Sequence, residues 1–318
     1  MEGKLETPFQ MENTKVWIAG HRGLVGGAIA KRLSRENCTI VTIDRDELDL
    51  RDQVGVKKWL EKEKPSIIIL AAAKVGGIVA NSTQPADFLY DNLVIETNII
   101  KAAHEIEVKK LLFLGSSCIY PRDAKQPMVE EELLTGPLEK TNESYAIAKI
   151  AGLKMCEAFR TQYGCDFISA QPTNLYGEGD KFDPEMGHVI PALMVKAHKG
   201  KLNNYSKLNV WGSGTPKREF LYIHDLADAL VHLLKNYSGK SHINIGTGEE
   251  FSIKQLAEKI CDVVGFQGKL VFDTTKPDGS PRKLVNNSRL AKLGWKSKTS
   301  LDEGLTKTYK WYLDNIAR

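Results

Sequence analysis

Residues 16–26 of the chain read VWIAGHRGLVG, an apolar run followed by glycines at every third position, Gly20, Gly23 and Gly26. The pattern is typical of a strand that turns tightly into a helix, where the backbone approaches a pyrophosphate closely and the helix amides attract its charge. A tight turn without a ligand is the simpler interpretation of the motif alone. The cation Arg22 inside the loop and the tyrosine-lysine pair described below favour dinucleotide binding.

Short β-branched runs alternate with amphipathic helical stretches from Lys15 onward. Runs that are apolar throughout, such as residues 67–70, suit strands covered on both faces, as in a parallel sheet. The sequence therefore predicts an α/β fold with a doubly wound parallel sheet of the Rossmann type and a smaller C-terminal substrate lobe. The predicted strands lie at residues 15–19, 39–43, 66–73, 111–115, 167–171, 220–223 and 242–246, with early helices at 24–36 and 53–63.

The regular alternation ends near Pro172, which predicts a division into two domains. Residues 15–172 and about 220–248 are expected to form the dinucleotide-binding domain. Residues about 173–219 and 249–318 are expected to form the substrate-binding lobe. Residues 1–14 are predicted to be an N-terminal extension outside the fold, because MEGKLETPFQ precedes a second methionine, Met11.

The composition excludes several classes of protein. The net charge of +4 arises from 44 basic and 40 acidic residues without a long basic run, which argues against nucleic-acid binding. The five cysteines form no CxxC pair, which argues against a disulfide framework and a structural zinc site and favours a reducing cytoplasm. No stretch approaches the roughly 20 apolar residues of a membrane span, and no secretory signal is recognisable at the start.

A second motif, SYAIAK, places Tyr145 and Lys149 four residues apart, on one face of a helix. An ammonium one turn from a phenol favours its ionised form and lets it exchange a proton with an alcohol or carbonyl. The pair also occurs by accident in helices. Ser116 and Ser117 strengthen the interpretation, because they follow the apolar run 111–114, and a strand's carboxyl end faces the ligand crevice of such sheets.

Eight segments, taken in order from about Lys15 to the C-terminus, resemble the GDP-L-fucose synthases, a family of extended short-chain dehydrogenases/reductases. The segments are GHRGLVG, AAAKVGGIVAN, LGSSCIYP, SYAIAK, PTNLYG, HVIPAL, VWGSGTPKREF and KPDGSPRKL. The resemblance implies a homodimeric NADPH enzyme acting on GDP-4-keto-6-deoxy-D-mannose. Such an enzyme epimerises the sugar at C3 and C5 and then reduces C4, which gives GDP-L-fucose.

The resemblance also implies roles for individual residues. Ser116, Tyr145 and Lys149 are expected to form the reductase triad, and Cys118 and His188 to serve epimerisation. The expected substrate contacts are Lys196, Trp211, Arg218 and Asp278, joined by Lys283, whose charge would help to neutralise a diphosphate. The expected cofactor contacts are Gly20, His21, Arg22, Gly23, Leu24, Val25, Gly26, Arg45, Leu114, Gly115, Ser116, Ser117, Tyr145, Lys149, Pro172, Thr173, Asn174, Leu175 and His188. Asp44 departs from the family pattern and, with Asp49 and Leu50, is expected at the cofactor from its place in the sequence alone.

Several of these residues have an ordinary structural interpretation as well. A free cysteine such as Cys118 is more often inert core, and His188 is otherwise a histidine at a helix start. Trp211 can pack the small lobe instead of stacking on guanine. Asp44 is placed to accept hydrogen bonds from the 2′-hydroxyl of NAD, whereas its neighbour Arg45 suits the 2′-phosphate of NADP, so both cofactors stay open, with NADP favoured.

Two alternatives compete with this prediction. One is another nucleotide-sugar epimerase, dehydratase or reductase of the same superfamily, although a dehydratase usually carries an acidic pair where this chain has Cys118-Ile119. The other is a non-catalytic dinucleotide sensor, which the intact set of Ser116, Tyr145 and Lys149 disfavours.

Overall fold

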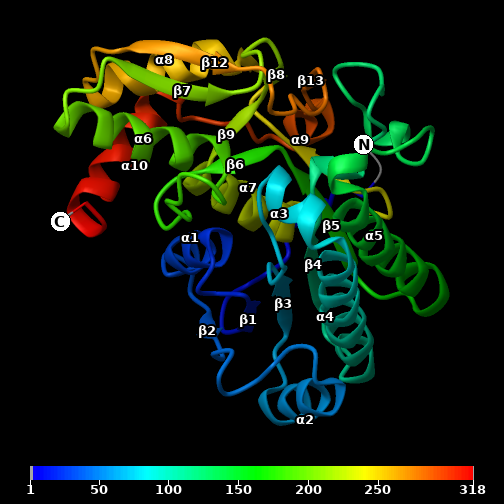
Figure 1. Ribbon diagram of the computed structural model, residues 1–318. Helices are drawn as coiled ribbons and strands as arrows, with labels where there is room; N and C mark the ends of the chain where they lie inside the picture. The colour runs from blue at the N-terminus through cyan, green and yellow to red at the C-terminus, as the bar shows by residue number, and fades with distance from the viewer. Residues whose placement is uncertain (1–2, 318) are drawn as a thin grey trace.

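The central element of the computed structural model, which describes residues 3–317, is a six-stranded parallel sheet in the order β10-β5-β4-β3-β1-β2 (Figure 1). The strand order reverses beside β1, as in a doubly wound fold, so the predicted fold class is confirmed. The strands are β1 (Lys15–Ala19), β2 (Thr39–Val41), β3 (Ile67–Leu70), β4 (Lys110–Leu114), β5 (Phe167–Pro172) and β10 (Ile243–Ile245).

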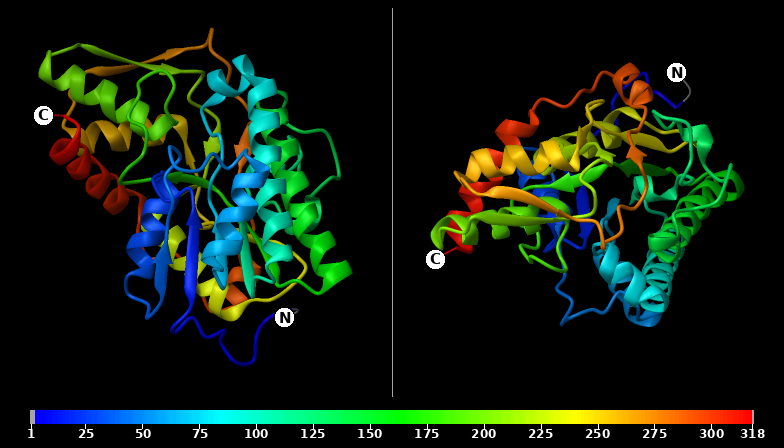
Figure 2. Two further views of the ribbon diagram at one scale, coloured as in Figure 1. Left: turned by 90° about the horizontal axis from the view of Figure 1, so that it is seen from below. Right: turned by 45° about the horizontal axis from the view of Figure 1, so that its top comes forward.

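Helices cover both faces of this sheet because alternate residues of each strand point to opposite sides. In β1, Val16 and Ile18 belong to one buried cluster with α1 and α7, and Trp17 belongs to a second one with α2, α4 and α5. Figure 2 shows α4 and α5 side by side along one flank. The flanking helices are α1 (Leu24–Leu33), α2 (Gln53–Glu63), α3 (Ile78–Thr83), α4 (Pro85–Glu105), α5 (Glu143–Tyr163) and α7 (Ile223–Asn236).

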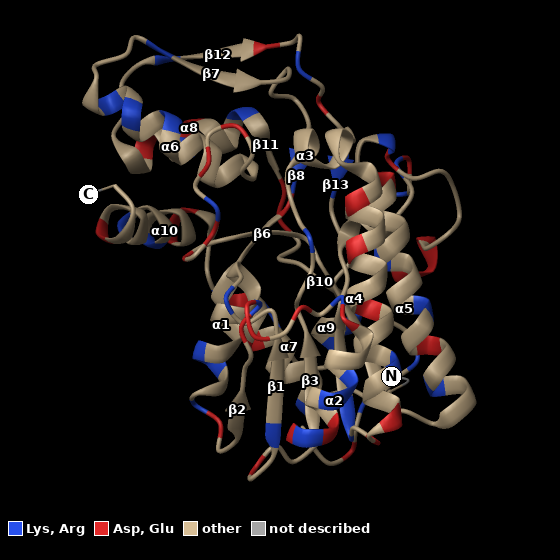
Figure 3. Ribbon diagram, turned by 60° about the horizontal axis from the view of Figure 1, so that its bottom comes forward, with Lys and Arg blue, Asp and Glu red and all other residues tan. Residues whose placement is uncertain are grey.

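A C-terminal lobe lies over one end of the sheet (Figure 1). In it, β7 pairs with β12 in parallel, and β8 lies between an antiparallel β11 and a parallel β13. Both β8 and β13 consist of basic residues, Lys217–Arg218 and Arg282–Lys283 (Figure 3). The lobe comprises α6 (Val189–Leu202), β7 (Lys207–Trp211), β8, β11 (Phe251–Ser252), α8 (Ile253–Val264), β12 (Lys269–Asp273), β13 and α10 (Leu301–Asn315). Helix α9 (Ser288–Lys292) instead packs against β10 of the six-stranded sheet.

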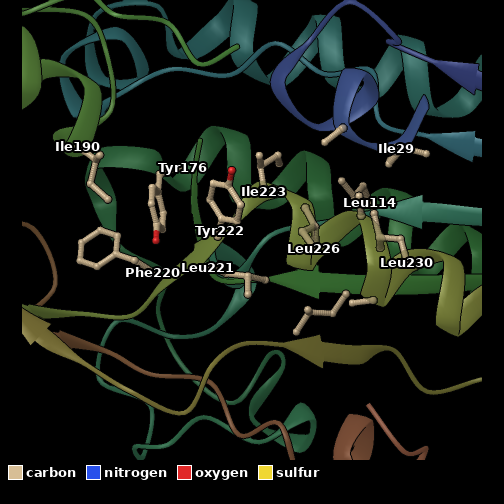
Figure 4. Close-up of a cluster of buried hydrophobic side chains, with 14 of the residues drawn as sticks. Ile29, Leu114, Tyr176, Ile190, Phe220, Leu221, Tyr222, Ile223, Leu226 and Leu230 are labelled. Atoms are coloured by element: carbon tan, nitrogen blue, oxygen red, sulfur yellow. The ribbon is translucent and has the colours of Figure 1, made fainter. Parts of the chain in front are cut away.

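The two parts of the chain meet through the segment 220–236. The predicted strand 220–223 is β9 (Phe220–Tyr222), which pairs with β6 (Asn174–Tyr176) outside the six-stranded sheet. Helix α7 follows at once, and its apolar residues point back toward Leu114 of the sheet (Figure 4). Leu226 and Leu230 are fully buried there, and burial of each such side chain contributes about 1.5–3 kcal/mol.

The N-terminal segment differs from the expectation that residues 1–14 lie outside the fold. Met11 is buried in the core, and the backbone amides of Leu5 and Phe9 donate to the carbonyls of Asn236 and Lys235 at the end of α7. Met11 is therefore part of the same buried cluster as Val16 and Ile18, and the segment before β1 belongs to the fold. Residues 1–2 lie outside the described part, and the division into two domains stays a prediction.

Candidate active site

The glycine loop between β1 and α1 has the geometry of a phosphate cradle. Gly20 has a φ of +91°, and a Cβ there would lie 2.7 Å from the backbone of Ala72. A Cβ on Gly26 would collide with the carbonyl oxygen of Gly20. Helix α1 begins after Gly23, which offers no side-chain cap, so its first amides are open to an anion. These residues fit a dinucleotide pyrophosphate.

Charged residues surround the expected ribose end of this loop. Asp44 accepts from Arg22, and its Oδ1 lies 3.1 Å from His21 Nε2, so one carboxylate contacts both side chains of the loop. Its neighbour Arg45 is exposed. Asp49 pairs with Arg51 at 2.7 Å, and the hydrogen bonds from Arg51 lower the pKa of Asp49 to about 2. The contact of Asp49 with an adenine stays a prediction.

The loop after β4 presents Ser116 and Cys118 together. Gly115 packs against the amide of Gln171, whose Oε1 accepts from the backbone amide of Ser116 at 2.6 Å. Ser116 Oγ accepts from the amide of Cys118 at 3.2 Å and so caps the short helix η1 (Ser117–Ile119). Because a single turn joins the two residues, the hydroxyl and the thiol occupy one end of β4, as the sequence predicts.

Two polar side chains from distant segments contact the Cys118 sulfur. Asn142 Nδ2 lies 3.1 Å and Lys283 Nζ 3.2 Å from Sγ. Burial alone would raise the pKa of Cys118, but Lys283, the hydrogen bond with Ser116 and the charge of Arg218 outweigh it and leave that pKa below the ordinary thiol value. These polar contacts disfavour the alternative interpretation of Cys118 as an inert core cysteine.

Tyr145 and Lys149 share one face of α5, but their electrostatic relation differs from the prediction. Lys149 Nζ lies 2.9 Å from Glu96 Oε1, donates to the carbonyl of Leu114 at 3.0 Å, and is 5.9 Å from the centre of the Tyr145 ring. Burial raises the pKa of Tyr145, and the charges of Cys118 and Glu96 raise it further. The predicted lowering of the Tyr145 pKa by Lys149 is wrong, because burial of the phenol raises that pKa and the ammonium is paired with Glu96.

His188 lies at the start of α6, where it is the residue before the first helical turn. Its Nδ1 is 3.6 Å from Oδ1 of the buried Asp180, and its side chain is half-exposed. Within residues 3–317 no hydrogen bond or ion pair joins it to Cys118. The two residues expected to serve epimerisation are thus not in direct contact. Direct contact is not required of two groups that act on opposite faces of one sugar.

The expected substrate residues gather in the C-terminal lobe. Trp211 is 37% exposed and lies between Lys196 Nζ at 4.9 Å and Lys276 Nζ at 5.4 Å from its ring centre. Asp278 Oδ1 accepts from the amide of Ser213 at 2.7 Å, so its carboxylate holds the turn after β7. Arg218 Nη2 donates to the carbonyl of Asp278 at 3.2 Å, which brings these residues to one surface.

The segment Pro172–Leu175 is held by a residue that the sequence analysis did not single out. The carbonyl of Glu219 accepts from Asn174 Nδ2 at 2.8 Å and from Thr173 Oγ1 at 3.3 Å. Its fully buried carboxylate accepts from the amide of Gly248 at 2.7 Å and from that of Val285 at 3.1 Å. The sequence did offer a signal for this role, because Glu219 is a charged residue directly before the apolar run 220–223.

Residues 16–246, most of the chain, match one protein family. The chain belongs to the NAD dependent epimerase/dehydratase family. The glycine loop, the six-stranded parallel sheet and the β4 loop described above all lie within the matched residues.

Relatives of this family member are similar over nearly their whole length. It is 57% identical to a GDP-L-fucose synthase of Sinorhizobium fredii, over 97% of this chain and 98% of the relative. It is 57% identical to GDP-L-fucose synthase 1 of Arabidopsis thaliana, over 96% and 95%. The crystal structure of a GDP-L-fucose synthetase from Naegleria fowleri bound to NADP superposes with a TM-score of 0.90 at 31% identity, covering 99% and 98% of the two chains. The predicted resemblance is confirmed.

Two further residues of this epimerase/dehydratase contact the reactive side chains without having been predicted. Glu96 is a buried carboxylate in α4, and the absence of a side chain at Gly152 leaves it room, since a Cβ there would lie 2.5 Å from Glu96 Oε2. A charged residue directly after the apolar residues 93–95 was a usable signal for Glu96. Asn142 offered none, because its role depends on the tertiary contact with Cys118.

The structure also bears on metals and membranes. Within the described chain, no group of three or more His, Cys, Asp or Glu side chains is arranged to hold a metal ion. None of the helices in residues 3–317 has the length and apolar character needed to cross a bilayer. All five cysteines are free thiols.

Proposed function

We propose that this chain is a GDP-L-fucose synthase, which converts GDP-4-keto-6-deoxy-D-mannose to GDP-L-fucose by 3,5-epimerisation and 4-reduction with NADPH. The observation that carries the proposal is that Ser116, Cys118 and Tyr145 lie together near the end of β4. The chain that places them there is 57% identical to enzymes of that name. Reduction alone needs no thiol with a lowered pKa. Removal of a proton from the carbon next to a ketone needs a base, and such a thiol can supply one.

Cys118 and His188 are the proposed proton-transfer residues of epimerisation. A thiolate at Cys118 removes a proton from the carbon next to the ketone, and the electron pair moves onto the carbonyl oxygen. His188, whose ring faces the carboxylate of Asp180, returns a proton from the other side of the sugar. One proton leaves and one arrives at each carbon, so the configuration changes without any net oxidation.

Tyr145 is the proposed proton donor for reduction at C4. Bound NADPH supplies the hydride equivalent for this reduction. Tyr145 gives its phenolic proton to the C4 oxygen, and Ser116 donates a hydrogen bond to the same oxygen. A phenol whose pKa is raised by burial stays protonated at neutral pH, which is the form this step requires.

The preference for NADPH over NADH is a further part of the proposal. The NADP-bound relative supports NADP as the cofactor, and exposed Arg45 supports a phosphate on the ribose. Asp44 opposes it, but this carboxylate is already paired with the guanidinium of Arg22. The remaining expected contacts of the glycine loop, the β4 loop and residues 172–175 are proposed to hold the cofactor.

On the substrate side, Trp211 and Lys196 are proposed to bind the guanine, and Arg218 the diphosphate. Asp278 supports Arg218 through its carbonyl. We also propose a homodimer formed through α4 and α5, where Tyr90, Ile147 and Tyr163 are 65%, 44% and 51% exposed, and a location in the cytoplasm, where the five thiols stay reduced.

The test is product analysis with GDP-4-keto-6-deoxy-D-mannose and NADPH in heavy water. We expect consumption of NADPH and a 6-deoxy sugar of L configuration that carries deuterium at C3 and C5, identified by NMR after separation. Reduction without deuterium at either carbon would identify a C4 reductase, and the absence of NADPH oxidation would contradict the proposed function altogether. Cys118→Ser should suppress the exchange, because a serine hydroxyl is a far weaker base than a thiol.

A further inference from the structure

The sulfur of Cys118 has a neighbour that neither the sequence nor the proposed chemistry accounts for. Lys283 comes from a strand 165 residues further along the chain, yet its Nζ lies 3.2 Å from Sγ. Asn142, at the end of the short helix η3 (Lys140–Asn142), donates from the other segment at 3.1 Å. Both side chains donate to the sulfur, an arrangement that suits a negative charge.

The backbone on both sides of Lys283 is held in place. Lys283 is in register with Arg218 of β8, and its carbonyl accepts from the amide of Glu219 at 3.2 Å. The next residue, Leu284, donates to Gln126 Oε1 at 2.9 Å, and its carbonyl accepts from the amide of Met128 at 2.8 Å. The ammonium thus reaches Cys118 from a strand that is hydrogen-bonded along both edges and is not part of a free loop.

The charged and titratable groups around the sulfur come from three elements. Lys283 of β13 and Arg218 of β8 are positive, and Tyr145 of α5 is a buried phenol. The nearest carboxylate on η3's flank, Glu139, is engaged elsewhere, with Arg122 at 3.5 Å and Thr141 at 3.2 Å. The field at Cys118 is therefore positive, and among these groups Lys283 is the one in contact.

We infer that Lys283 is a positioning residue that holds the side chain of Cys118 as a thiolate, and is not primarily a ligand of the substrate diphosphate. The inference rests on the proposed function for its meaning, because a resting thiolate is a base ready to take the proton next to the ketone. In that step the sulfur gains a proton, the C–H bond breaks and its electron pair moves onto the carbonyl oxygen. Lys283 keeps its own protons throughout.

The test measures the ionisation of Cys118 without any substrate. The whole protein is alkylated with iodoacetamide at a series of pH values, and the rate at Cys118 is followed by mass spectrometry of its peptide. The rate reports the thiolate fraction, so its midpoint gives the thiol pKa, while its plateau at high pH reports access. Lys283→Met should raise the midpoint by about one to two pH units, since a cation in contact with a thiolate is removed.

Three variants make the result specific. Lys283→Gln keeps a hydrogen-bond donor but drops the charge, and it should raise the midpoint as well, which decides the question should Lys283→Met fail to fold. Lys283→Arg should restore a midpoint near that of the wild type. Lys269→Met, at an exposed site on β12, removes the same charge from the same lobe and should leave midpoint and turnover unchanged. An unchanged midpoint in both Lys283→Met and Lys283→Gln would overturn the inference.

Turnover separates the inference from the proposed function. With GDP-4-keto-6-deoxy-D-mannose, loss of the thiolate should slow deuterium exchange at least tenfold at pH 7 and leave the KM for the sugar nearly unchanged. A phosphate ligand would behave in the opposite way, with a raised KM and normal exchange, and that result would overturn the inference. If the wild type does not turn over this substrate at all, the proposed function fails, while the alkylation midpoints still decide the role of Lys283.

Discussion

The buried pair of Glu96 and Lys149 leads to a prediction about stability. Their side chains are 1% and 2% exposed, and 2.9 Å separates Lys149 Nζ from Glu96 Oε1. Removal of one partner leaves an uncompensated buried charge and costs about 3–5 kcal/mol, whereas replacement of both by apolar residues is often neutral. We expect Glu96→Leu and Lys149→Met each to lower the free energy of unfolding by about that amount, and the double variant to lower it by less than either.

The assay is urea-induced unfolding of the wild type and the three variants at pH 7, read as midpoint and slope. The double-mutant cycle should give a coupling energy of about 3 kcal/mol or more. The matched control is Glu303–Lys307 on α10, which is separated by 2.6 Å but is 52% and 47% exposed, so its coupling should be about 0.5 kcal/mol or less. Equal coupling energies in the two cycles would refute the argument that burial makes the Glu96–Lys149 pair indispensable.

The same pair has a consequence for catalysis. The charge of Glu96 raises the pKa of Tyr145, so Glu96→Gln should lower that pKa and leave Lys149 to act on the phenol unopposed. The alkaline limb of C4 reduction should therefore move to lower pH. A pH profile of NADPH oxidation that is identical in the wild type and Glu96→Gln would mean that the carboxylate does not influence Tyr145.

Three further predictions concern single residues. Tyr145→Phe should abolish C4 reduction because no proton donor remains, and NADPH oxidation at the wild-type rate would exclude this role. Arg45→Ala should reduce kcat/KM for NADPH more than for NADH, and equal losses would show that Arg45 does not recognise the 2′-phosphate. Burial lowers the pKa of His242 to about 3, so the folded state resists protonation, and stability present above about pH 6.5 should be lost as the pH falls. By pH 5 the loss relative to His242→Asn should be about 2 kcal/mol in urea unfolding, and parallel pH dependence of the two proteins would contradict it.

The parts of the structure that were predictable from the sequence are those with local signals. The glycine loop is recognisable because Gly20 and Gly26 leave no room for a side chain, so glycine is required at these positions. The strands are recognisable because residues such as 67–70 are buried on both faces and are therefore apolar throughout. Met11 was misjudged since a short segment before the first strand has no periodicity to reveal that it is buried. The proximity of Lys283 to Cys118 could not be predicted, because it depends on how β13 pairs with β8.

The two lysines of the site have different partners, and this difference separates the two proton-transfer roles. Burial raises the pKa of Tyr145, the charges of Cys118 and Glu96 raise it further, and Lys149 is paired with Glu96, so the phenol keeps its proton and is suited to give it to an alkoxide. Lys283 has the sulfur of Cys118 as its partner, so the thiol loses its proton and is suited to take one from carbon. A phenolate beside Lys149 would be the wrong form for reduction, and a neutral thiol would be the wrong form for epimerisation. Burial of the phenol and a cation at the thiol thus allow an acid and a base of similar intrinsic strength to coexist in one site in the forms their steps require.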